Sequence, residues 1–167
     1  MKRNGADMSK IVYKKGNAID ALKSGEIDYL IHQCNSKGVM GAGIAKEIKA
    51  RVPEAFAAYK NEYVFFSERF GRNLPLGSCT TGGGVINLVA QTDFGNGGRY
   101  TNYGALASAF CSLFNGVQDF DLRQPSNLVI GVPKYIGCGL GGGDWDVVLE
   151  LIKHCLTWCK QVIIYEL

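Results

Sequence analysis

The sequence lacks the features that mark membrane, secreted and highly charged proteins. No apolar run approaches the ~18 residues of a membrane-spanning helix, and residues 1–10 (MKRNGADMSK) contain no apolar signal-peptide core. The formal net charge is only +3, which is too small to indicate a nucleic-acid partner. Hydrophobic residues make up 47% of the chain, which excludes a disordered protein. We therefore expect a globular, cytoplasmic protein with no membrane or nucleic-acid partner.

Metal-binding and cofactor motifs are missing as well. His32 and His154 are the only histidines, and the six cysteines form no Cys-x-x-Cys pair. There is no GK[ST] phosphate-binding motif, no HExxH and no GxSxG. We expect no metal ion and no cofactor. We also expect reduced thiols, since no secretory signal is present, with a structural disulfide as the less favoured alternative.

Glycine, by contrast, is abundant and clustered. The chain has 22 glycines and only 4 prolines. The glycines concentrate around 38–43, at 82–84 and at 141–143. Clusters of this kind are typical of tight loops in which the backbone approaches a ligand.

The length of 167 residues predicts one domain, here residues 10–167 after a frayed tail at 1–9. Apolar runs predict strands at 11–13, 29–34, 77–81, 85–90, 128–132 and 162–165. Helical spacing predicts helices at 18–24, 44–52, 53–63, 103–114 and 145–159, with irregular segments at 64–75, 91–99 and 116–126. Because strands and helices alternate, we expect an α/β fold, a three-layer α/β/α sandwich with a mixed central sheet.

Two segments share the order apolar strand, glycine-rich loop, helix: residues 29–50 and residues 128–158. In α/β folds, ligands bind beyond the carboxyl ends of strands, where helix N-termini present free N–H groups to anions. Two such loops in one small domain indicate a ligand with more than one phosphate. The alternative is that both loops are structural turns.

These loops also carry a family resemblance. Residues 31–35 (IHQCN) and 38–46 (GVMGAGIAK) resemble the ribose-binding segment of macrodomains. Residues 136–145 (IGCGLGGGDW) are similar to the second phosphate loop of these proteins, and residues 164–167 to their closing strand. The similarity covers about residues 10–167. It is nearest to the subgroup that contains ADP-ribose 1″-phosphate phosphatases and terminal ADP-ribose glycohydrolases, and it implies an ADP-ribose-type ligand.

The resemblance also implies roles for single residues. Asn17 and Ala18 would contact adenine, Tyr165 would stack on its ring, Leu167 would close that end, and Asn35 would bind the distal ribose. The alternatives are a core-edge aromatic for Tyr165 and a loop-capping amide for Asn35. The full set of expected ligand-binding residues is Gly16, Asn17, Ala18, Gln33, Cys34, Asn35, Met40, Gly41, Ala42, Gly43, Ile44, Ala45, Gln91, Thr92, Tyr135, Ile136, Gly137, Cys138, Gly139, Leu140, Gly141, Tyr165 and Leu167.

The sequence departs from the glycohydrolase pattern at two positions. That pattern implies a lysine after the hairpin strand and an acid after Cys-Gly-Leu, where this chain has Gln91 or Thr92 and Gly141. His32, in contrast, matches a histidine of the phosphatase-like members. As a nucleophile or proton donor, His32 would need to face the ligand. In a regular strand, however, the side chains of His32 and Asn35 point to opposite faces of the sheet. A buried core histidine is an equal alternative.

Asp144 is the candidate general base, or the partner of His32, with a helix N-cap as the equal alternative. Asp93 is a weaker choice, Arg99 could attract a phosphate, and Phe94 could line the distal pocket. We therefore predict a monomeric, metal-independent ADP-ribose 1″-phosphate phosphatase with His32, Asn35 and Asp144 as catalytic residues. A hydrolase of ADP-ribosyl conjugates on protein or nucleic acid and a non-catalytic ADP-ribose reader remain the alternatives.

Overall fold

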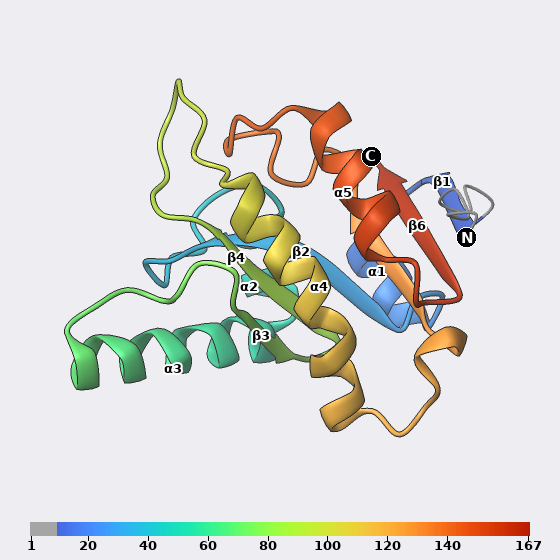
Figure 1. The fold of residues 1–167 in the computed structure, drawn as a ribbon, viewed down its shortest axis with the longest axis horizontal. Coiled ribbons are helices and arrows are strands. Elements are labelled where there is room, and N and C mark those ends of the chain that lie inside the picture. Colours follow the sequence, from blue (N-terminus) through green and yellow to red (C-terminus); the bar gives the residue numbers. More distant parts are fainter. Residues whose placement is uncertain (1–9) are drawn as a thin grey trace, which may run out of the picture.

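The computed structural model describes residues 10–167 (Figure 1). The tail expected at 1–9 lies outside the described residues. The elements, in chain order, are β1 (Ile11–Lys15), α1 (Ala18–Ser24), β2 (Tyr29–Asn35), α2 (Gly43–Arg51), α3 (Pro53–Phe70), β3 (Cys79–Gly82), β4 (Val85–Gln91), α4 (Tyr103–Phe120), the 3₁₀ turn η2 (Pro125–Asn127), β5 (Val129–Pro133), α5 (Trp145–Cys155) and β6 (Gln161–Glu166).

The six strands form one mixed sheet in the order β1-β6-β5-β2-β4-β3. All neighbours are parallel except β3, which pairs antiparallel with β4. Gly83 and Gly84 connect this hairpin with φ angles of +60° and +79°. Two consecutive left-handed residues suit a tight hairpin turn, and glycine adopts them without a Cβ penalty.

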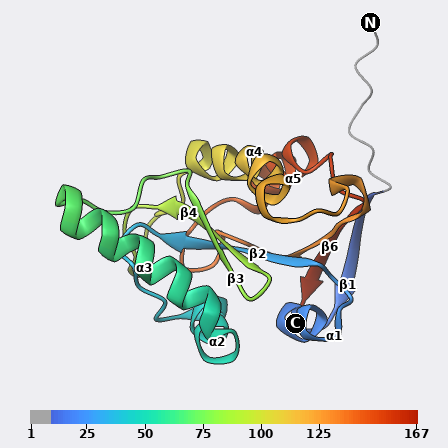
Figure 2. The ribbon, with the colours of Figure 1, turned by 90° about the horizontal axis from the view of Figure 1, so that it is seen from below.

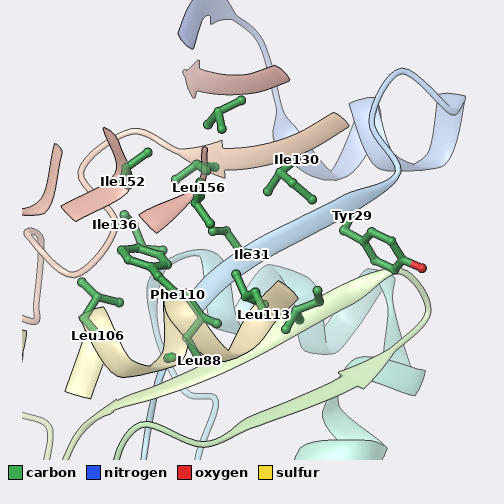
Figure 3. Close-up of a cluster of buried hydrophobic side chains, with 14 of the residues drawn as sticks. Tyr29, Ile31, Leu88, Leu106, Phe110, Leu113, Ile130, Ile136, Ile152 and Leu156 are labelled. Atoms are coloured by element: carbon green, nitrogen blue, oxygen red, sulfur yellow. The ribbon is translucent and has the colours of Figure 1, made fainter. Parts of the chain in front are cut away.

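Helices cover both faces of the sheet, as Figure 2 shows: α4 and α5 lie on one side, and α1, α2 and α3 on the other. The side chains of β2 point alternately to these two faces of the sheet. Ile31 joins the cluster that contains Phe110 of α4 (Figure 3), whereas Leu30 packs with Ile19 of α1 and Ile48 of α2. The expected three-layer sandwich with a mixed sheet is confirmed.

Two helices are longer than the sequence predicted, and one is shorter. Helix α3 continues to Phe70 and α4 to Phe120, through parts of the segments expected to be irregular. In α4 the added turn buries Val117 against the core. Helix α5 ends at Cys155, so Cys159 lies beyond it rather than in its apolar stripe. Cys159 is nevertheless buried in the same core cluster.

The carboxyl ends of the five parallel strands, β1, β2, β4, β5 and β6, lie at one edge of the sheet. The pairing of β2 with β4 is shifted by one residue between Cys34 and Asn35. This irregularity breaks the strict alternation of side chains, because an inserted residue changes the facing of those that follow. Among residues 10–167, no helix is long and apolar enough to cross a membrane.

Candidate ligand-binding cleft

A cleft of about 860 Å³ opens at this edge of the sheet. Its volume is in the range of small-molecule sites. It is lined by Gly16, Asn17, Ala18, His32, Gln33, Cys34, Asn35, Val39, Gly41, Ala42, Gly43, Ile44, Ala45, Glu47, Gln91, Phe94, Gly95, Asn96, Pro133, Lys134, Tyr135, Ile136, Gly137, Gly139, Leu140, Gly141, Tyr165, Glu166 and Leu167. Both glycine-rich loops identified in the sequence therefore contribute to one site.

The first loop leads into the N-terminus of α2. Residues 41–45 line the cleft, and Ala42 at the N-cap supplies no side-chain hydrogen bond to the first turn. The free N–H groups of that turn, together with the helix dipole, favour a bound anion. Gly38 has a φ of +73° and lies so close to Tyr63 that an added Cβ would come within 2.6 Å of the ring. This loop therefore needs glycine at position 38.

Asn35 holds the same loop in place. Its Oδ1 accepts hydrogen bonds from the N–H of Lys37 (3.0 Å) and the hydroxyl of Tyr59 (2.9 Å). Its Nδ2 donates to the carbonyl oxygen of Val39 at 2.7 Å. The side chain thus caps the loop, which is the alternative role that the sequence analysis gave for Asn35. The second hydrogen of Nδ2 has no partner within residues 10–167, and Asn35 lines the cleft.

The second loop is built around Gly137 and Gly141. Gly137 has a φ of +71°, and its carbonyl oxygen accepts a hydrogen bond from the Thr101 hydroxyl at 2.6 Å. The carbonyl of Gly141 accepts from the N–H groups of Tyr100 and Thr101. A Cβ on Gly141 would lie 2.5 Å from the Thr101 Oγ1 atom. The loop is therefore fixed against residues 100–101, a contact that the sequence did not reveal.

Gln33 connects the strand ends beneath this loop. Its Nε2 donates to Oε1 of Gln91 at 2.8 Å and to the Thr101 hydroxyl at 2.7 Å. Both of its N–H groups are used, and its Oε1 is buried with no hydrogen-bond partner among the described residues. A buried acceptor without a donor is unfavourable unless a ligand or water supplies one. Thr101 joins this network although the sequence analysis did not select it.

The opposite end of the cleft is formed by the loop after β1 and the end of β6. Asn17 caps α1 through Oδ1, and its Nδ2 donates to Glu47 at 2.9 Å. Glu166 accepts a hydrogen bond from Lys134 at 2.8 Å. Glu47, Lys134 and Glu166 therefore belong to a charged rim that sequence reasoning missed.

Tyr165 lines the cleft, but little of its ring is accessible for stacking on adenine. Its side chain is only 4% exposed and packs with residues of α1. Burial, together with nearby Glu26, raises the pKa of the Tyr165 hydroxyl well above its usual value. Stacking needs an accessible ring face, and on this rim Tyr135 has one, with 51% of the residue exposed. Tyr135 holds a left-handed φ of +64° and packs edge-on against Trp145.

His32 lies beneath the cleft with none of its surface exposed. Its Nε2 is 2.6 Å from Oδ1 of Asn87. The amide nitrogen of Asn87 donates to Ala55 and Thr80, so Oδ1 is the acceptor and His32 Nε2 carries the proton. Burial lowers the pKa of His32 to about 4. His32 is therefore a neutral core histidine, and this environment argues against the catalytic role that the sequence suggested.

Asp144, unlike His32, is not among the residues that line the cleft. Its Oδ1 accepts a hydrogen bond from the N–H of Asp146 at 2.8 Å, which makes it the N-cap of α5. The Asp144 N–H donates to the hydroxyl of Tyr103. The guanidinium of Arg99 lies over the Tyr103 ring, 4.7 Å from its centre, and Arg99 is not among the lining residues. The base and phosphate roles expected for Asp144 and Arg99 have no support here.

Three of the expected ligand contacts also fall outside the lining. Met40 packs in a core cluster with Tyr59. Thr92 accepts a hydrogen bond from Ser36 through its carbonyl oxygen. The thiol of Cys138 donates to the carbonyl of Ile136. Residues next to them in the sequence, such as Gly41, Gln91 and Gly137, line the cleft instead.

Lys37 and Asp93 form an ion pair at the distal rim. Lys37 Nζ lies 2.9 Å from Asp93 Oδ1 and 5.9 Å from the centre of the Phe94 ring. Asp93 also accepts a hydrogen bond from the Phe94 N–H. Phe94, Gly95 and Asn96 line the cleft beside this pair. Lys37 was not selected from the sequence, and its pairing with Asp93 joins two loops that are far apart in the chain.

The fold and the cleft define an α/β/α protein whose glycine loops and free helix N-terminus suit a phosphate-bearing ligand. A family model described as Macro domain matches residues 31–152. This chain therefore belongs to the Macro domain family, and the resemblance drawn from the sequence is confirmed.

Curated relatives and solved structures extend this result. ADP-ribose 1″-phosphate phosphatases of Saccharomyces cerevisiae and Candida glabrata are 42% and 40% identical over 72 residues. Those residues cover 43% of this chain and only 37% and 36% of the two relatives. The macrodomain of Mycobacterium tuberculosis DarG has a TM-score of 0.68 at 22% identity, covering 94% of this chain and 97% of that one.

A second solved structure is Thermosipho africanus DarTG in complex with ADP-ribose. It has a TM-score of 0.69 at 17% identity, and the match covers 92% of this chain and 41% of that one. At such identities the likeness establishes the fold alone.

Proposed function

We propose that this protein binds an ADP-ribose-type ligand and hydrolyses ADP-ribose 1″-phosphate to ADP-ribose and phosphate. The observation that carries the binding is the meeting of two glycine loops at one cleft, one of them leading into an uncapped helix N-terminus. The names of the two fungal relatives support the phosphatase activity.

The lining residues indicate how the ligand is oriented in the cleft. The adenine end lies against Asn17, Ala18 and Leu167. The diphosphate lies between residues 41–45 and 137–141, where backbone N–H groups can donate to its oxygens. The distal ribose then lies at Asn35, whose free amide hydrogen can donate to a ribose oxygen.

The terminal phosphate falls at the distal rim, beside the lining residue Phe94. The Lys37–Asp93 pair borders this residue without itself being part of the lining. The ammonium of Lys37 attracts the phosphate. The neighbouring ammonium of Lys37 lowers the pKa of Asp93, which keeps the carboxylate ionised but makes it a weaker base. The carboxylate can orient the water and take up its proton as the bond to phosphorus forms. The water oxygen bonds to phosphorus as the bond from phosphorus to the 1″ oxygen breaks. The water proton passes to Asp93, and the 1″ oxygen takes a proton from solvent.

A non-catalytic reader is the second candidate, and one observation favours it. Two of the three residues selected for catalysis, His32 and Asp144, are respectively buried and outside the cleft. A cleft that binds ADP-ribose without turning it over would need neither residue. The Lys37–Asp93 pair is then only a surface ion pair, which contributes little to stability.

The test is phosphate release from ADP-ribose 1″-phosphate with EDTA present, alongside calorimetric titration with ADP-ribose. We expect release by the wild type and a loss of about a hundredfold in kcat for Asp93→Asn. Lys37→Gln raises KM by about tenfold. Arg99→Gln, on the same loop but turned to Tyr103, is the matched control and keeps both values.

Other results contradict either the proposed activity or the proposed role of Asp93. Binding of ADP-ribose without phosphate release supports the reader, or the hydrolase of ADP-ribosyl conjugates if such a conjugate is then cleaved. Neither binding nor release contradicts the whole assignment. Full turnover by Asp93→Asn removes the distal pair from the mechanism while leaving the phosphatase intact.

A further inference from the structure

Two thiols lie in contact on the side of the sheet covered by α4 and α5. The sulfur of Cys111 in α4 is 3.6 Å from the sulfur of Cys155, the last residue of α5. Cys111 is exposed and Cys155 is half-buried. A disulfide needs a sulfur–sulfur distance of about 2.0 Å, so the two sulfurs must approach by about 1.6 Å from their contact distance to form the bond.

The other four cysteines have different surroundings. Cys34 lies against the His32 ring. The thiols of Cys79, Cys138 and Cys159 are directed to the backbone carbonyls of Ala109, Ile136 and Leu156. Each is buried or half-buried. Cys111 and Cys155 are thus the pair in which one sulfur can reach another without rearranging the core.

The difference in exposure between the two thiols determines which of them reacts first. Cys111 is open to a reagent in solution, whereas burial and the neighbouring thiol raise the pKa of Cys155 to about 11. Thiolates, not thiols, attack disulfides. Because Cys111 is the exposed thiol of the two, it meets an oxidant in solution first. The sulfur of Cys155, 3.6 Å away, is placed to complete the exchange.

We propose that Cys111 and Cys155 form a reversible dithiol–disulfide site that joins α4 to α5. With glutathione disulfide as oxidant, the Cys111 thiolate attacks one glutathione sulfur and releases a glutathione thiolate. The Cys155 thiolate then attacks Cys111 Sγ, and the second glutathione leaves. The pair is oxidised by two electrons, and glutathione disulfide is reduced to two molecules of glutathione.

The bond would close a long segment of chain. Cys111 and Cys155 are 44 positions apart, and the segment between them contains β5, the second glycine loop and most of α5. A cross-link over such a segment lowers the entropy of the unfolded chain. Oxidation should therefore raise the thermal midpoint by roughly 5–10 °C.

The experiment incubates the folded, reduced protein with glutathione disulfide and maps its products by mass spectrometry. We expect the loss of two hydrogens and a single cross-linked peptide joining Cys111 to Cys155. The thermal midpoint should rise, and dithiothreitol should reverse both changes. The Cys155→Ser variant should instead carry glutathione on Cys111, and Cys111→Ser should form no bond.

Cys79→Ser is the matched control, because Cys79 is half-buried beside α4 but faces a carbonyl. It should form the cross-link as the wild type does. The proposal is overturned if the wild type gains only glutathione adducts, if the cross-link joins other cysteines, or if it forms only in denaturant. These readouts do not depend on the activity of the cleft.

Discussion

The hydroxyl of Tyr59 lies 2.6 Å from the main-chain oxygen of Asn35 and 2.9 Å from the side-chain oxygen of the same residue. Tyr59 is in the middle of α3 and is fully buried. The hydroxyl also accepts the N–H of Val39 at 3.1 Å. One side chain of α3 thus holds the strand end and the first glycine loop together.

Removal of this hydroxyl tests the link between α3 and the cleft. Tyr59→Phe should lower the free energy of unfolding by about 1–3 kcal/mol, because it leaves buried groups without a partner. It should also weaken ADP-ribose binding several-fold. Denaturant unfolding and calorimetry measure the two effects. Tyr63→Phe, one turn further along α3, is the control and should change neither. Unaltered binding in Tyr59→Phe would mean that the loop keeps its shape without this contact.

His32 should make stability depend on pH. Its pKa in the folded protein is about 4, below its ordinary 6.5, so the unfolded chain binds a proton that the folded protein excludes. The stability from burying the neutral ring is complete above pH 6.5 and is lost as pH falls toward 4. The loss amounts to about 3 kcal/mol over that interval.

Urea unfolding between pH 7 and pH 4 measures this effect. His32→Gln should flatten the decline, because glutamine does not titrate and its amide can still donate to Asn87. His154→Gln replaces an exposed histidine at the end of α5 and should leave the wild-type slope. Equal slopes in wild type and His32→Gln would contradict the assignment of a neutral buried imidazole.

Two glycines of the second loop should differ sharply in their tolerance of alanine. Gly137 has a left-handed φ, and its added Cβ would lie 2.5 Å from Oε1 of Gln33. Gly137→Ala should lower the free energy of unfolding by about 2–3 kcal/mol. Gly139 has an ordinary φ and open space around its Cβ position, so Gly139→Ala should cost less than about 1 kcal/mol. Similar values for both variants would show that the loop adapts.

Asp144 should behave as a cap and not as a base. Asp144→Ala removes the hydrogen bond to the Asp146 N–H and should lower the free energy of unfolding by about 1 kcal/mol. The rate of phosphate release should stay within about twofold of the wild type. Asp146→Ala, which removes charge from the same turn without removing the cap, should cost less stability. A large fall in kcat at unchanged stability would restore Asp144 to the mechanism.

The sequence alone determined the elements that depend on local physics. Alternation of apolar runs and helical stripes gave the layers, because these periods are properties of neighbouring residues. Glycine clusters located both cleft loops, since glycine adopts a left-handed backbone such as that of Gly38 or Gly137 without a Cβ penalty. Most of the residues predicted to line the cleft were identified from these two segments and from the family resemblance.

Only the tertiary structure decided what each side chain does at the cleft. Whether His32 faces a ligand or the core depends on Asn87, 55 positions away on the neighbouring strand. The support of Gly137 by Thr101 and the contact of Cys111 with Cys155 are also long-range. A one-residue shift in the pairing of β2 with β4 at Asn35 redirects the side chains there. Such relationships arise when strands and helices pack, and no local pattern in the chain records them.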